Sequence, residues 1–111
     1  MNVYDTANRL AQEIKESTEY QAYKKAKEEI KEKPDLNEKL KKFEQMRYDI
    51  QMAAMQGKEA IDTKTEEMQN LYAELVKDEF MKQYFDAEFK FNVMLGDVNK
   101  IIGEAVRDIL M

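Results

Sequence analysis

The stretch Asp78–Met111, DEFMKQYFDAEFKFNVMLGDVNKIIGEAVRDILM, contains no proline and reads as one long amphipathic helix. At about 100° per residue, eleven of its apolar side chains fall within roughly a third of the circumference. This apolar stripe predicts that the helix lies against other helices, and it indicates no chemical reaction. The stripe consists of Phe80, Tyr84, Ala87, Phe91, Met94, Leu95, Val98, Ile101, Ile102, Ala105 and Ile109.

The predicted helix is long for a chain of 111 residues. About 32 residues at a rise of roughly 1.5 Å each span about 48 Å. A compact chain of this size is a sphere only about 34 Å across. Either the molecule is elongated, or the protruding part of the helix packs on another chain.

A second face of this helix also points to another chain. Phe85, Phe89 and Val93 are spaced by four and lie roughly opposite the apolar stripe, and Gly96 and Gly103 continue the same face. An interior helical glycine costs about 1 kcal/mol relative to alanine, but it lets a partner backbone approach closely. We interpret these five residues as a dimer or partner face. The alternative is that the glycines are merely tolerated and the phenylalanines pack inside the monomer.

The rest of the chain also favours helix. There are only one proline and three glycines, and 37% of the residues are charged, which is typical of helical proteins with large surfaces. Cap signals lie at Asn2, at Ser17-Thr18, at Pro34-Asp35 and at Asp78. We expect an all-α fold: an elongated bundle of four to five helices with a long C-terminal helix, forming a single domain over residues 1–111. The predicted helices are 3–16, 19–32, 36–55, 64–77 and 79–110.

The last two helices follow each other without an intervening proline or glycine. Carrying the pattern of the fourth helix forward nevertheless places Phe80, Tyr84 and Phe91 on the wrong face by about 120°. A break near Lys77-Asp78, with Asp78 as the cap, restores the phase. A continuous kinked helix is the alternative.

Arg47 falls at the centre of the apolar pattern of the third helix, where an apolar residue is expected. Its stem can lie along a groove with the guanidinium in water. Alternatively, Arg47 forms a buried ion pair with an inward carboxylate, for which Glu88, at the border of the apolar stripe, is the candidate.

The composition excludes several kinds of site. The chain has no cysteine and no histidine, which removes disulfides, thiolate metal sites and histidine general bases. Its carboxylate pairs are adjacent on helices, so they point about 100° apart and do not converge. We therefore predict no catalytic residues, no cofactor, no metal site and no enzymatic activity. The apolar runs are too short for a membrane span, and no signal peptide is evident, so a cytoplasmic protein is expected.

The net charge of −5 disfavours general binding to nucleic acid, whose phosphates attract Lys and Arg. Eight lysines do lie between Lys24 and Lys42, but acidic residues are interleaved with them. Such a pattern is more often a solvated helix surface than an RNA site.

The sequence resembles the YlbF/YheA/YmcA family of small helical bacterial proteins over essentially its whole length, and it is closest to the YheA-like branch. The resemblance implies an all-α, homodimeric cytoplasmic protein. The residues that carry it are Val3-Tyr4-Asp5 with Ala7 and Leu10, Ser17 with Glu19-Tyr20, Pro34-Asp35, Phe43, Gly57, Ala87-Glu88, Met94-Leu95 and Lys100-Ile101-Ile102.

Characterised relatives act as regulatory partners that influence competence, sporulation and biofilm formation, through an endoribonuclease that processes mRNA. Some hold iron–sulfur clusters on cysteines, and this chain departs from them because it has none. The resemblance thus implies a non-catalytic regulatory or adaptor protein that contacts itself and other regulatory proteins. The alternative is an RNA-associated accessory factor that uses the lysine-rich second and third helices.

Overall fold

Side-chain caps fix the start of three helices in the computed structural model, which describes residues 2–57 and 62–110. The Asn2 side chain accepts hydrogen bonds from the backbone N–H groups of Tyr4 and Asp5, at 2.9 and 3.4 Å. Ser17 Oγ accepts from Tyr20 N at 3.1 Å. These bonds satisfy donors that have no partner inside the helix, and each helix therefore begins at a defined residue.

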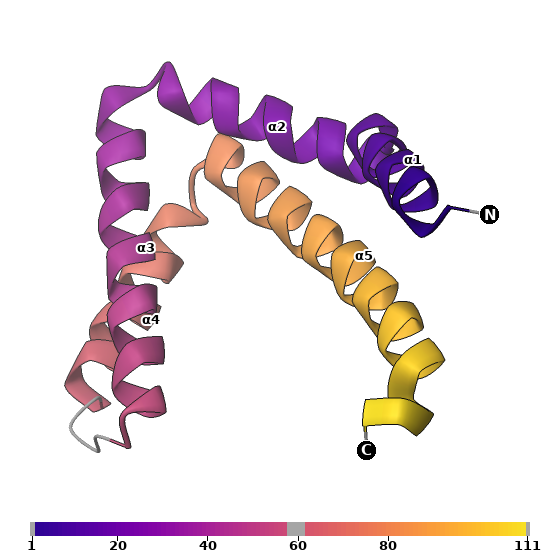
Figure 1. Ribbon diagram of the computed structural model, residues 1–111. Coiled ribbons are helices and arrows are strands. Elements are labelled where there is room, and N and C mark those ends of the chain that lie inside the picture. Colours follow the sequence, from indigo (N-terminus) through magenta and orange to yellow (C-terminus); the bar gives the residue numbers. More distant parts are fainter. Residues whose placement is uncertain (1, 58–61, 111) are drawn as a thin grey trace. The chain divides into compact units, whose positions relative to one another are not determined.

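The described part of the chain is all α-helical, which confirms the predicted fold class (Figure 1). No strand occurs among these residues. The long C-terminal helix has the predicted bounds. The helices are α1 Val3–Glu16, α2 Thr18–Lys31, α3 Pro34–Met55, α4 Asp62–Leu75 and α5 Glu79–Leu110.

Two caps differ in detail from the sequence-based expectation. Ser17 caps α2, and Thr18 is already its first residue. Helix α3 begins at Pro34 with Lys33 as a cap that makes no side-chain bond, so Asp35 lies in the first turn. Proline is well suited to the first helical position because its missing N–H is not needed there. At its other end, α3 stops before Gly57, whose φ of +71° is costly for residues with a side chain.

The junction between α4 and α5 is a true break, and a continuous kinked helix is excluded. Helix α4 ends at Leu75 and α5 begins at Glu79. Asp78 Oδ1 accepts from the backbone N–H groups of Phe80 and Met81, at 2.9 and 3.2 Å. The break allows each helix to direct its own apolar face inward, as the 120° change of phase predicts.

The chain forms two compact units, of which the second is the continuous segment Lys27–Gln83. In it, α3 and α4 pack against each other. Phe43 contacts Tyr72, with ring centroids 5.9 Å apart, and Lys39 Nζ lies 3.2 Å from Glu74 Oε1. The later residue on α3 contacts the earlier residue on α4, so the two helices are antiparallel. The buried side chains of this unit are Ile30, Leu40, Phe43, Leu75 and Met81.

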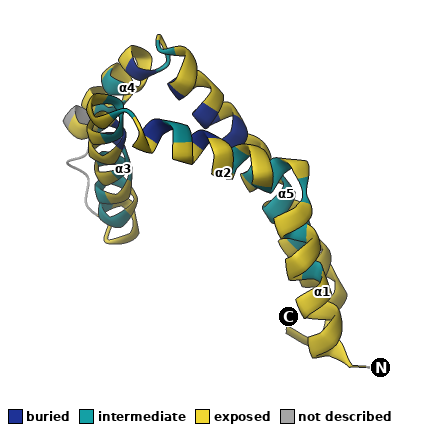
Figure 2. Ribbon diagram, turned by 90° about the horizontal axis from the view of Figure 1, so that it is seen from above, coloured by how far each residue is buried: buried dark blue, intermediate teal, exposed yellow. Residues whose placement is uncertain are grey.

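The first unit combines the chain up to Ala26 with the chain from Tyr84 onward. The start of α2 packs antiparallel on α5, since Tyr20 contacts Phe91 and Tyr23 contacts Tyr84, with centroid distances of 6.1 and 5.5 Å. Helix α1 has no buried residue. In Figure 2, the buried colour marks the beginning of α5 and gives way to exposed residues toward its end. A single domain over residues 1–111 stays a prediction.

Candidate functional site

A hydrogen-bonded tyrosine–carboxylate cluster occupies the centre of the first unit. The Tyr23 hydroxyl donates to Glu88 Oε2 at 3.3 Å and lies 3.5 Å from the Tyr84 hydroxyl. Glu88 is only 8% exposed and Tyr84 is completely buried. A buried carboxylate requires such partners, because an unpaired charge in an apolar interior is costly. No buried polar side-chain atom among the described residues lacks a hydrogen bond.

Aromatic rings close off this cluster. The Tyr23 ring lies 5.5 Å from those of both Tyr84 and Phe91, and Phe85 meets Tyr84 edge-on at 5.5 Å. These distances are typical of favourable aromatic pairs in a packed core. The cluster therefore stabilises the unit.

Arg47 lies in the second unit and is partly buried. Its guanidinium carbon is 5.4 Å from the centroid of the Phe43 ring, one turn away on the same helix. This cation–π contact accounts for part of its position in an apolar pattern. The ion pair between Arg47 and Glu88 stays a prediction.

A double-mutant cycle tests that ion pair. If the pair exists, Arg47→Met and Glu88→Gln each lower the free energy of unfolding, and the double variant loses less than the sum, with a coupling energy of at least about 1 kcal/mol. Glutamine keeps an acceptor for the Tyr23 hydroxyl, so the cycle isolates the charge. Urea unfolding of the four proteins measures the effect, and strictly additive losses would contradict the pair.

The face predicted for a dimer or partner divides into a covered and an uncovered part. Phe85 is 9% exposed, so its ring belongs to the interior. Phe89 and Val93 are 67% and 46% exposed. A Cβ added at Gly96 or Gly103 would meet no atom of the described chain within 4 Å. The four residues Phe89, Val93, Gly96 and Gly103, named the glycine face below, therefore remain open to a second molecule.

The apolar stripe also divides into two parts. Tyr84 and Ala87 are buried, and the stripe residues from Phe91 to Val98 are partly buried. From Ile101 onward every described residue of α5 is exposed, including Ile102 at 52% and Ile109 at 80%. Sequence periodicity could not reveal this division, because it reports which side of a helix is apolar and not what covers that side.

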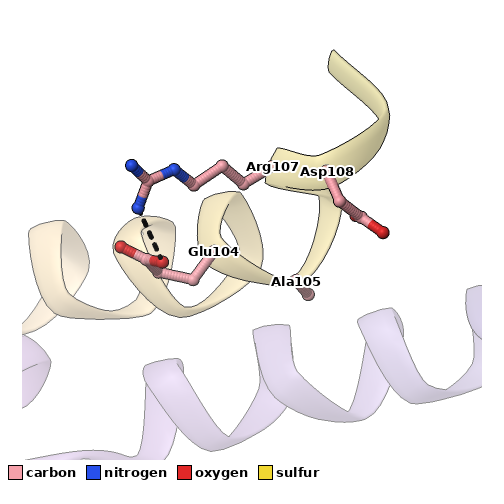
Figure 3. A pocket seen from close by; sticks show the side chains of 4 residues that line it. All are labelled: Glu104, Ala105, Arg107 and Asp108. Atoms are coloured by element: carbon pink, nitrogen blue, oxygen red, sulfur yellow. Dashed lines mark ion pairs between the residues drawn. The ribbon is translucent and has the colours of Figure 1, made fainter. Parts of the chain in front are cut away.

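A surface pocket lies near the end of α5 and is lined by Glu104, Ala105, Arg107 and Asp108 (Figure 3). An Arg107 nitrogen is 3.6 Å from Glu104 Oε2, and both side chains are more than half exposed. In Figure 3 the Arg107 and Glu104 side chains point toward each other, whereas Asp108 points away from them. Exposed groups without a shared focus do not form a catalytic centre.

Within the described ranges 2–57 and 62–110, no group of three acidic, histidine or cysteine side chains is arranged to hold a metal ion. None of the helices described there is long and apolar enough to cross a membrane. Lys24 and Lys25 are exposed on α2, whereas other lysines pack locally: Lys33 Nζ, for example, lies 4.2 Å from the centroid of the Phe80 ring.

A family model described as control of competence regulator ComK, YlbF/YmcA, matches residues 3–107. A UPF0342 protein of Desulfitobacterium hafniense is 37% identical over 110 residues, covering 99% of this chain and 89% of its own. One from Symbiobacterium thermophilum is 38% identical over 104 residues, covering 94% and 93%. One from Limosilactobacillus reuteri is 33% identical over 109 residues, covering 98% and 89%. The similarity thus extends over nearly the whole chain in each case.

Proposed function

Since the chain belongs to the YlbF/YmcA family, we propose that it is a non-catalytic regulatory or adaptor protein that acts in the cytoplasm through protein–protein contacts. The family is named for control of the competence regulator ComK, which fits a regulatory role. Competence, sporulation, biofilm formation and mRNA processing are the processes that the resemblance suggests.

The observation that carries this proposal is the exposure of apolar side chains along α5. Phe89, Val93, Ile101, Ile102, Val106, Ile109 and Leu110 are between 40% and 80% exposed. These residues lie on two sides of α5, and exposed apolar patches of this kind mark sites where another molecule binds. An adaptor requires such surfaces, whereas an enzyme requires converging reactive groups.

We assign the glycine face to self-association. Phe89 and Val93 supply apolar area, and the open helix surface at Gly96 and Gly103 allows a second backbone to approach closely. In a two-fold dimer the same patch faces itself, so one such face per chain is sufficient.

Affinity capture of the tagged protein from extract of its native cell tests the adaptor function. The capture is made with and without nuclease, and bound proteins are identified by mass spectrometry. We expect a protein partner in stoichiometric amount that survives nuclease, because protein–protein contact does not depend on nucleic acid. An untagged lysate and a tagged unrelated helical protein serve as controls.

Partners that disappear after nuclease treatment would contradict the adaptor function and favour the RNA-associated alternative. The exposure of Lys24 and Lys25 on α2 is the observation that favours this alternative. In that case RNA binding would weaken with salt and would be lost on charge reversal at Lys24, Lys25 and Lys27.

A further inference from the structure

We propose that the uncovered end of the apolar stripe on α5 docks an amphipathic helix with a basic edge from another protein. This inference rests on the adaptor function and names the surface and the kind of partner. The surface, named the docking stripe, consists of Ile101, Ile102, Ala105, Val106 and Ile109, all of which are exposed.

The spacing of the docking stripe is that of a helix-binding surface. Ile102, Ala105, Val106 and Ile109 follow the order i, i+3, i+4, i+7, which places them along one side of α5. The stretch spans just over two turns, or roughly 12 Å, which suits a local contact of one helix with another. Ala105 is the small residue within it, so a partner helix can approach closely there.

One edge of the docking stripe is acidic and the other carries no charge. At about 100° per residue, Asp97, Glu104 and Asp108 lie on the same edge. Glu104 shares its charge with Arg107 at 3.6 Å, and the pocket of Figure 3 lies at this edge. Among the residues that the structure describes, no ion pair involves Asp97 or Asp108. The opposite edge presents Asn99 and Leu110.

This charge pattern selects the occupant. An edge with three carboxylates attracts lysine or arginine beside the apolar side of a partner and repels acidic residues. A second copy offers poor complementarity: in an antiparallel pair the two acidic edges would meet, and in a parallel pair an acidic edge would meet an uncharged one. The docking stripe also lies roughly opposite the glycine face, at about 160°, so a dimer formed there leaves it accessible.

Two synthetic amphipathic peptides of 18 residues, with the same leucine–alanine stripe, test the proposal. One carries lysines along the edge of its stripe and the other carries glutamates. Fluorescence anisotropy with the full-length protein measures both affinities. We expect the lysine-edged peptide to bind at least tenfold more tightly at low salt, and the preference to diminish at about 1 M salt.

Variants locate the binding. The triple variant Asp97→Lys, Glu104→Lys, Asp108→Lys is expected to invert the preference. Asp108→Lys alone is expected to weaken the preference for the lysine-edged peptide. The matched control is Asp86→Lys, exposed on α5 beside the covered part of the stripe, and it should leave this preference unchanged. The double variant Ile102→Ser, Ile109→Ser is expected to lower the affinity for both peptides tenfold or more. Tyr48→Ser, at a residue 57% exposed on α3, is expected to change neither affinity.

Several results would overturn the proposal. These are equal affinity for the two peptides, no binding of either, or binding that survives Ile102→Ser with Ile109→Ser. A light-scattering mass that is halved by this double variant would show that a second copy occupies the stripe. If the double variant still captures the stoichiometric partner from extract, the docking stripe is refuted while the adaptor function stands; if the wild type captures none, the adaptor function itself fails.

Discussion

Replacement of Tyr84 by alanine is expected to lower the free energy of unfolding by about 3–5 kcal/mol, the usual cost of removing a large buried aromatic ring. Tyr84 is completely buried, and its ring contacts those of Tyr23 and Phe85 at 5.5 Å. The loss combines the lost burial of the ring with the cavity left behind. Urea unfolding followed by circular dichroism, at one fixed protein concentration, measures the change.

Two controls separate the ring from its hydroxyl and from tyrosine in general. Tyr84→Phe removes only the hydroxyl that lies 3.5 Å from that of Tyr23, so we expect a loss of about 1 kcal/mol. Tyr48→Ala, at a residue 57% exposed, is expected to change the stability by no more than about 0.5 kcal/mol. A loss below 1 kcal/mol for Tyr84→Ala would contradict a core centred on this ring.

Alanine at Gly96 and Gly103 is expected to affect folding and self-association in opposite directions. Within one chain nothing lies within 4 Å of the added Cβ atoms, so each substitution stabilises the helix by about 1 kcal/mol. In a dimer that brings a second backbone against these glycines, the methyl groups force the helices apart. We expect the dissociation constant to rise tenfold or more, equivalent to about 1.4 kcal/mol.

Light scattering across a dilution series measures the mass against that of one chain, 13.2 kDa. Phe89→Asp with Val93→Asp places two charges in the proposed interface and is expected to yield single chains. Tyr48→Asp is the matched control outside it. A mass of one chain for the wild type at micromolar concentration would refute self-association through the glycine face. An unchanged dissociation constant for the alanine variants would refute the close approach of the backbones.

The sequence is informative about this fold because most helix boundaries are set locally. Asn2 and Asp78 reveal their helix starts through side chains that accept backbone N–H groups, and the change of phase at Lys77 requires the break that the structure contains. The start of α3 is placed too late because the Asp35 carboxylate resembles a cap, whereas proline at the first position makes a side-chain cap unnecessary. Ser17 and Thr18 are chemically equivalent caps, so only the backbone path distinguishes them.

The candidate binding surfaces are harder to predict from the sequence than the helix boundaries are. The position of Glu88 at the border of the stripe indicates an inward carboxylate, and the structure buries it. Its hydrogen bond from Tyr23, 65 positions earlier in the chain, leaves no local signal. Phe85 and Phe89 share a face by spacing, yet only Phe89 is exposed. The exposure of each side chain depends on its neighbours from other helices, and the spacing within one helix does not reveal these neighbours.

The division of the chain into two units also affects the order in which its parts can fold during synthesis. The second unit is continuous from Lys27 to Gln83, whereas the first unites the two ends of the chain. During synthesis the α3–α4 hairpin can therefore form while α5 is still being translated. Tyr23 must wait for Tyr84 and Glu88 to leave the ribosome, because contacts between distant positions form only after the intervening loop is closed. The nascent chain thus carries the aromatic edge of α2 without its partners on α5 until α5 emerges.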